Sequence, residues 1–238
     1  MQFRCNDTYR DQLDDYTKRD GIKALALYAA FLLVFGCMAA GDKYLPSKVA
    51  AQGVMTAINL ALIGVAVSFA LRDNKGLRSV GIIGGNWKTS VLVGLACAAV
   101  LFFFNCAIYL LQGHSLINGK SIVLNAVVYL IVALCEELVF RGYIGTRLYG
   151  VFKRQWLTAV ITGALFVLMH YCYPVVSLLT SGVPVSELAT YNFGGLRSIA
   201  DRFVTHSVFT IIYAKTNSLY GAIIPHWISN LAFHMVAR

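Results

Sequence analysis

Two adjacent glutamates lie at the end of a long apolar stretch, in the segment CEELVFRG at 135–142. A charged side chain at the centre of a membrane helix costs roughly 2.5–3.5 kcal/mol on insertion scales, so carboxylates in such a stretch are candidates for function. Glu137 and Arg141 are four residues apart with the acid first, the favoured order for an ion pair on a helix. Glu136 lies about 100° further around the helix, away from this pair. The alternative is a pair at the membrane edge, with Glu136 facing water.

Two later apolar stretches carry a histidine each. The first reads FVLMH and runs from Phe166 to His170, and the second reads HWISN and places His226 and Asn230 on one helical face. A lone histidine in an apolar helix often bonds to a carbonyl and indicates little. Two polar side chains on one stripe of an apolar helix indicate hydrogen bonding between helices or a shared site. Together with Glu136, these residues form a constellation on three apolar stretches, and we interpret it as an active site.

The elements that position these residues are predicted from composition and block length. Apolar residues make up 58% of the 238 positions and charged residues 13%, whereas soluble domains have about 45–50% and about 25%. The apolar residues form long blocks, and roughly 20 such residues in a helix cross a bilayer core of about 30 Å. The sequence therefore predicts an all-α, polytopic transmembrane helical bundle of about seven spans, six to eight. The candidate spans are 23–40, 49–71, 90–112, 121–140, 156–177, 197–214 and 218–237.

Charge distribution predicts the organisation and orientation of the chain. Residues 1–22 are polar, with mixed charge and no secretory-signal pattern, so we expect a cytoplasmic N-terminal tail followed by a single membrane domain at 23–238. If the N-terminus is inside, 14 of the 20 Lys and Arg residues lie on that side, and the positive-inside rule favours this orientation in the cell membrane. The basic residues are spread over separate loops, so no nucleic-acid partner is expected.

The order of the motifs resembles that of a known family. The glutamate pair with arginine, then Phe-x-x-x-His, then His-x-x-x-Asn, is similar to the CPBP family, which contains the CAAX proteases and the bacteriocin-processing (Abi) intramembrane peptidases. The resemblance covers about 118–236. It implies an endopeptidase with its site inside the membrane, open to the cytoplasmic side. The implied substrate is a membrane-associated or hydrophobic peptide or protein, lipidated ones included, and the implied surroundings are the lipid bilayer.

The resemblance also implies a role for each motif residue. Glu136 would be the general base that activates a water, and His170 would position that water. His226 and Asn230 would stabilise the oxyanion at the scissile carbonyl. Burial makes a carboxylate a better base near neutral pH, which agrees with this assignment. Three further motif residues would support these four: Glu137, Arg141 and Phe166.

Other interpretations stay open. Glutamate and two histidines are ligand types of catalytic zinc, but the His-Glu-x-x-His helix is absent and asparagine is a poor zinc ligand, so we expect no cofactor and no required metal. A non-catalytic bacteriocin self-immunity or scaffold protein of the same fold is a second interpretation. An ion or proton transporter is a third, although many transporters show two similar halves and we find none.

The predicted spans place Glu136 and His170 at different depths in the membrane. Glu136 lies about five residues, roughly 7 Å, from the cytoplasmic end of its predicted span. His170 lies about fourteen residues, roughly 21 Å, into the next. The two residues meet only if the later helix begins well outside the hydrocarbon or the earlier one continues past Arg141.

Overall fold

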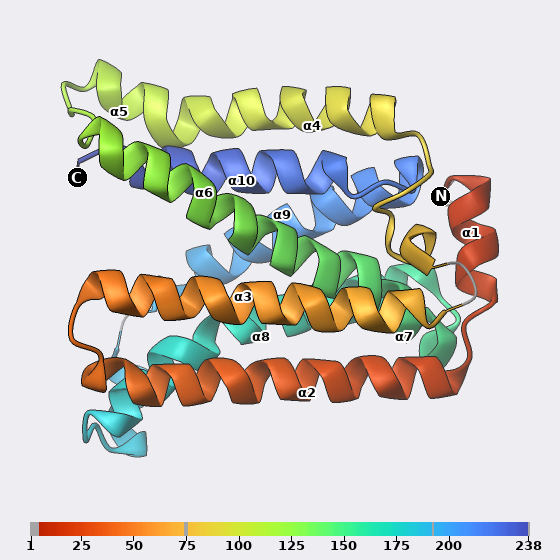
Figure 1. The fold of residues 1–238 in the computed structure, drawn as a ribbon, viewed down its shortest axis with the longest axis horizontal. Coiled ribbons are helices and arrows are strands. Elements are labelled where there is room, and N and C mark those ends of the chain that lie inside the picture. The colour runs from red at the N-terminus through yellow and green to blue at the C-terminus, as the bar shows by residue number, and fades with distance from the viewer. Residues whose placement is uncertain (1–4, 74–75, 192, 238) are drawn as a thin grey trace. The chain divides into compact units, whose positions relative to one another are not determined.

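The computed structural model describes residues 5–73, 76–191 and 193–237, and these residues are helical throughout, apart from short connections. An isolated bridge joins Leu116 and Val236, and the described residues form no strand. The α-helices are α1 Asp7–Asp14, α2 Lys18–Gly41, α3 Lys48–Leu71, α4 Trp87–Phe102, α5 Ile108–Leu111, α6 Gly119–Glu136, α7 Thr146–Phe152, α8 Gln155–Thr180, α9 Gly195–Thr216 and α10 Tyr220–His234 (Figure 1). The predicted all-α class is confirmed.

Shorter helical turns of two other kinds connect these helices. Three are 3₁₀ turns: η1 Asp42–Tyr44, η2 Gly76–Val80 and η5 Val185–Thr190. Two are π-helical segments, η3 Phe103–Ala107 and η4 Glu137–Gly145. Neither π segment was predicted. Three of the basic residues counted for the orientation, Arg4, Lys75 and Arg238, lie outside the described residues.

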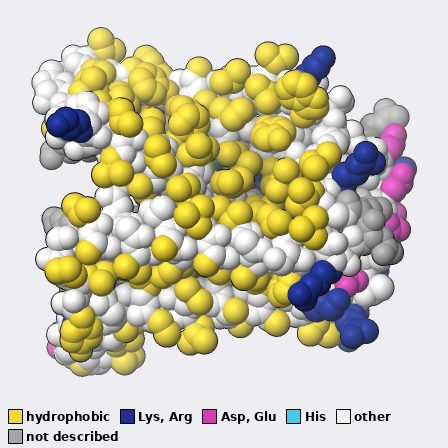
Figure 2. All heavy atoms as spheres, viewed as in Figure 1, with side chains coloured by type: hydrophobic (Ala, Val, Ile, Leu, Met, Phe, Trp, Pro, Cys, Tyr) yellow, Lys and Arg dark blue, Asp and Glu magenta, His cyan; other side chains and the backbone are white. Residues whose placement is uncertain are grey.

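Five helical runs of the described chain are long and apolar enough to cross a membrane. They are Lys18–Tyr44, Val49–Leu71, Trp87–Leu111, Gly119–Phe152 and Gln155–Thr180. Each contains or closely matches one of the first five predicted spans. Hydrophobic side chains cover the helices on the face shown in Figure 2, and most of the Lys and Arg side chains visible there lie near helix ends. These features are those of an integral membrane protein.

The sixth and seventh predicted spans are helices as well, but they are not among these five. The sixth is α9, which carries three charged residues between positions 197 and 202. The seventh is α10, whose 15 residues extend roughly 22 Å at about 1.5 Å per residue, which is less than the core of a bilayer. The number of spans is therefore roughly, and not fully, as predicted.

The chain divides into two compact units. Unit 1 consists of Met1–Gln12, Asn59–Tyr143 and Phe209–Arg238, and unit 2 of Leu13–Ile58 and Ile144–Val208. The single membrane domain stays a prediction.

In unit 1, α10 packs along α4 and α6 (Figure 1). Small residues allow the close approach to α4, because a Cβ on Gly94 would lie only 3.0 Å from the Cα of Gly221. Ser90 accepts a hydrogen bond of 2.8 Å from the backbone N–H of Gly221. On the α6 side, Trp227 Nε1 donates to the carbonyl of Ala126 at 2.8 Å. Helix α10, which carries two of the predicted site residues, is thus held by polar bonds on two sides.

The first residues of unit 1 are folded rather than extended. In α1, the ring of Tyr9 packs edge-on against Tyr213 with centroids 5.2 Å apart. Gln12 is buried and its Nε2 donates to the carbonyl of Ser79 at 2.7 Å. The part of the predicted tail that belongs to unit 1 therefore packs within that unit, and the cytoplasmic location of the tail stays a prediction.

In unit 2, α2 packs against α7 and α8. A Cβ on Gly21 would overlap the side chain of Val151, so this glycine sets the distance between α2 and α7. The hydroxyl of Tyr28 donates to the carbonyl of Leu165 in α8 at 2.9 Å. A Cβ on Gly163 would lie 2.8 Å from the ring of Phe203, so α8 and α9 also pack closely. These contacts fix the helix that carries Phe166 and His170.

Candidate active site

The two glutamates occupy a junction between two kinds of helix. Helix α6 ends at Glu136, and the π-helical segment η4 begins at Glu137. Segments of π-helix in α-helices are frequent at functional sites. The helical run that contains this junction continues to Phe152, well past Arg141. The continuation of this helix past Arg141 is one of the two conditions under which Glu136 and His170 could lie at the same depth.

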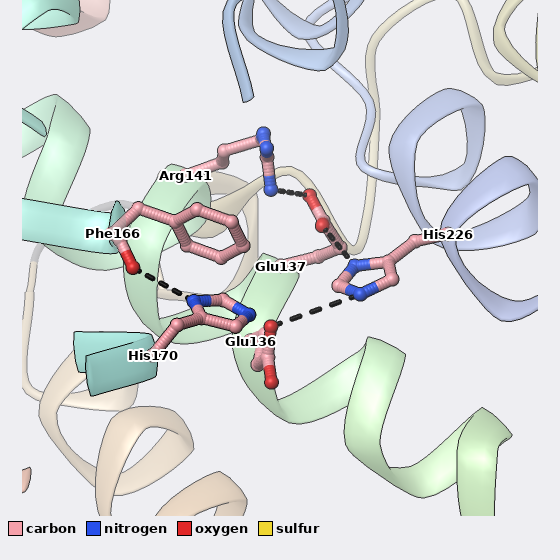
Figure 3. A network of polar contacts seen from close by, with 6 residues as sticks. All are labelled: Glu136, Glu137, Arg141, Phe166, His170 and His226. Atoms are coloured by element: carbon pink, nitrogen blue, oxygen red, sulfur yellow. Dashed lines mark hydrogen bonds and ion pairs between the residues drawn. The ribbon is translucent and has the colours of Figure 1, made fainter. Parts of the chain in front are cut away.

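Glu137 is fully buried and has two partners (Figure 3). One carboxylate oxygen, Oε2, forms an ion pair with Arg141, which is itself only 3% exposed. The other, Oε1, accepts a hydrogen bond from Nδ1 of His226 at 2.6 Å. The predicted pair between Glu137 and Arg141 is thus confirmed. The bond to His226, from a helix 89 residues further along the chain, was not predicted.

Glu136 faces the other side of the same imidazole ring. Its Oε2 lies 3.7 Å from Nε2 of His226, which exceeds hydrogen-bond length but is within ion-pair range (Figure 3). Because a carboxylate only accepts, the proton of the short bond to Glu137 lies on Nδ1. The ring nitrogen left for chemistry is therefore Nε2, on the side of Glu136. Hydrogen bonds of catalytic groups are often long before substrate binds.

The cluster in unit 1 combines two carboxylates with a guanidinium and an imidazole, all little exposed. Buried charges are tolerated when they are paired, and here the ion pair and the imidazole supply that pairing. The guanidinium of Arg141 also lies over the ring of Phe209, 5.2 Å from its centroid. Phe209 is 2% exposed and belongs to the last part of α9. No spacing in the sequence singled out this aromatic ring.

Asn230 lies one turn after His226 on α10 and is half-buried. The two residues share a helical face, as their spacing predicted. Within the described part of the chain, the side chain of Asn230 forms no hydrogen bond or ion pair with the cluster. Its role in the oxyanion site stays a prediction.

The remaining site residues, His170 and Phe166, belong to unit 2. Nδ1 of His170 lies 2.8 Å from the carbonyl oxygen of Phe166, and the two rings meet edge-on with centroids 4.6 Å apart (Figure 3). A carbonyl only accepts, so Nδ1 carries the proton and Nε2 is the acceptor of the neutral ring. Phe166 also packs against the buried ring of His206, with centroids 5.1 Å apart. The approach of His170 to Glu136 stays a prediction.

A metal site needs several donor side chains grouped together. Among residues 5–73, 76–191 and 193–237, no three His, Cys, Asp or Glu side chains are grouped so that they could hold a metal ion. The expectation that no metal is required stays a prediction.

Comparison with known proteins gives one match. The model of the Rce1-like family, described as type II CAAX prenyl endopeptidase Rce1-like, matches residues 117–232. No curated protein and no solved structure matches the chain. The matched residues include every predicted site residue and nearly coincide with the range expected from the motifs. Members of this family are typically proteases, and the match indicates CAAX-type intramembrane protease activity. The resemblance to the CPBP family that the motif order predicted is therefore confirmed for residues 117–232, which are similar to the Rce1-like CAAX prenyl endopeptidases.

Proposed function

We propose that the chain is an intramembrane endopeptidase that uses a glutamate-activated water. The observation that carries the proposal is the His226 ring, whose two nitrogens face two different glutamates. Glu137 is engaged on both oxygens, by Arg141 and by His226. Glu136 lies beyond hydrogen-bond length from the ring. The two glutamates therefore contact His226 differently, Glu137 by a hydrogen bond and Glu136 at ion-pair distance, and this difference supports a division of roles between them.

Glu136 acts as the general base in this proposal. Its carboxylate takes a proton from a water, and the oxygen of that water attacks the carbonyl carbon of the scissile peptide bond. When the C–N bond breaks, the proton passes to the leaving amine, which balances the reaction as a hydrolysis. Such a base typically contributes about 10²–10⁴-fold to the rate. In this proposal His170 positions the water. This role is assigned only because the Phe-x-x-x-His motif resembles that of the family.

His226 and Asn230 stabilise the oxyanion. With the Nδ1 proton engaged by Glu137, Nε2 donates to developing negative charge when the ring is the doubly protonated imidazolium, which the two nearby carboxylates favour. The amide of Asn230 lies on the same helical face and supplies a second donor. Donors that are already placed in a site of low dielectric can contribute about 2.7–4 kcal/mol each. Glu137 and Arg141 then act as positioning residues for His226.

The substrate proposed for this site is a membrane-associated or hydrophobic peptide or protein, and lipidated C-terminal segments are included. The experiment is comparative peptidomics of cells that express the chain and cells that express Glu136→Ala at matched levels. Peptides that appear only with the unchanged chain identify both the substrate and the bond. If the two peptidomes agree while both proteins are folded and inserted, the chain acts as a non-catalytic immunity or scaffold protein instead.

We also propose that the N-terminus and the segment around Arg154 are cytoplasmic, on the strength of the basic-residue distribution. Single cysteines at two exposed positions, Arg154→Cys and Lys120→Cys, test this in a cysteine-free background. An impermeant thiol reagent added outside the cell should label position 120 and leave position 154 unlabelled. The opposite pattern would reverse the orientation.

A further inference from the structure

An asparagine outside the family match contacts the helix of the oxyanion residues. Nδ2 of Asn105 donates a hydrogen bond of 3.0 Å to Oγ of Ser229. Ser229 directly precedes Asn230 on α10, whereas Asn105 lies in the apolar run Trp87–Leu111. A polar side chain at such a position is costly unless it is bonded. Both residues belong to unit 1.

Asn105 lies where its own helix departs from regular α-helical geometry. It is the third residue of the π-helical segment η3, in which the N–H of Ile108 bonds to the carbonyl of Phe103 five residues earlier. Relative to a regular helix, the extra residue changes by about 100° the direction in which neighbouring side chains point. The adjacent Cys106 is fully buried against Ala232, so this segment packs directly on α10.

The bond to Asn105 is one of two that flank the face of the oxyanion residues. At about 100° per residue, the middle of the face shared by His226 and Asn230 lies about 80° from Trp227 on one side and about 80° from Ser229 on the other. Trp227 is bonded to α6, and Ser229 is bonded to Asn105. Two bonds on opposite flanks resist rotation of the helix in either direction.

From this geometry we infer that Asn105 is a positioning residue of the peptidase site: its bond to Ser229 fixes the rotation of α10 and so aims His226 and Asn230. The inference rests on the proposed function, because the orientation of His226 and Asn230 affects the rate only if these two residues stabilise a transition state. A misplacement of about 1 Å by a distant change can cost about 10²-fold in rate. Loss of one of two flanking bonds should cost less, about 10-fold.

The test compares Asn105→Ala, Ser229→Ala and the double variant in cleavage of a peptide identified by the peptidomics. Each single variant should lower kcat about 10-fold and leave KM within about twofold, because an interaction made only in the transition state affects kcat. The double variant should lose less than the sum of the two single losses, since both changes remove the same bond. The exchange of the two residues, Asn105→Ser with Ser229→Asn, should recover part of kcat.

Two control variants separate the effect of the Asn105–Ser229 bond from other causes of a lower kcat. Ser68→Ala removes a hydroxyl that bonds only within its own helix, to the carbonyl of Gly64, and should leave kcat unchanged. Glu136→Gln reports on the proposed function itself. If Glu136→Gln cleaves as well as the unchanged chain, the proposed function fails and this inference fails with it.

If Glu136→Gln is inactive, the Asn105 variants decide alone. A normal kcat, a rise in KM alone or additive losses in the double variant would each overturn the positioning role. If Asn105→Ala does not fold, Ser229→Ala, a change of one hydroxyl, decides by the same criteria.

Discussion

The two histidines predicted for the site, one in each unit of the chain, are held in different ways. In unit 1, His226 is bonded to the buried carboxylate of Glu137, which also pairs with Arg141. In unit 2, Nδ1 of His170 is bonded to the backbone carbonyl of Phe166, four residues earlier in the same helix. His226 thus bonds to a buried carboxylate from another helix, whereas the bond of His170 to Phe166 lies within one helix. We expect from this difference that His226 contributes more to stability than His170.

The largest effect should come from Glu136, the proposed general base. Glu136→Gln keeps the size of the side chain and removes the base, so cleavage should fall by at least about 10²–10⁴-fold. Folding should change little, because a neutral amide is easier to bury than a carboxylate. The measurement is cleavage per folded molecule of purified protein, with Glu187→Gln, at an exposed position, as the matched control. Normal cleavage by folded Glu136→Gln would remove the base from the mechanism.

The same substitution at both histidines tests the comparison directly. His226→Leu and His170→Leu should each lower kcat, by about 10²–10³-fold for the oxyanion donor His226. His226→Leu should lower stability more than His170→Leu, by about 1.5–3 kcal/mol, because it leaves the charged Glu137 without one of its bonds. Melting in detergent, measured beside cleavage, separates the two effects. Equal melting temperatures for both variants would show that His226 contributes no more to stability than His170.

Glu137 should show a smaller catalytic effect together with a large loss of stability. Glu137→Gln breaks a buried ion pair and leaves Arg141 unbalanced, which typically costs about 3–5 kcal/mol. Adding Arg141→Gln should recover part of this stability, since neither charge is then alone. Cleavage per folded molecule should stay about 10-fold low in the double variant, because His226 still lacks its carboxylate. Full recovery of cleavage would mean that Glu137 acts only through Arg141.

Removal of metal should have the smallest effect. Thorough chelation of the purified protein should leave both cleavage and melting temperature unchanged, and elemental analysis should find no stoichiometric zinc. Loss of cleavage that zinc alone restores would replace the glutamate mechanism with a metallopeptidase.

Some of this architecture could be predicted because it depends on local sequence. The apolar blocks predicted five of the helical runs, since the length of an apolar helix is read directly from composition. Spacing of four predicted the pair of Glu137 with Arg141 and the shared face of His226 and Asn230, because helical geometry fixes which side chains are neighbours. The order of three motifs predicted the family. Each of these inferences needs only one helix at a time.

The tertiary structure decided which residue of one helix meets which residue of another. The bond between Glu137 and His226 joins positions 89 residues apart, and the bond between Asn105 and Ser229 joins positions 124 residues apart. Partners of this kind depend on how each helix is rotated about its axis, and rotation is set by packing at small residues such as Gly94. The π-helical segments also change the direction in which side chains point, and α-helical spacing in the sequence does not predict this change. The sequence by itself determined the chemical groups and the faces that carry them, whereas packing between helices determined which groups meet.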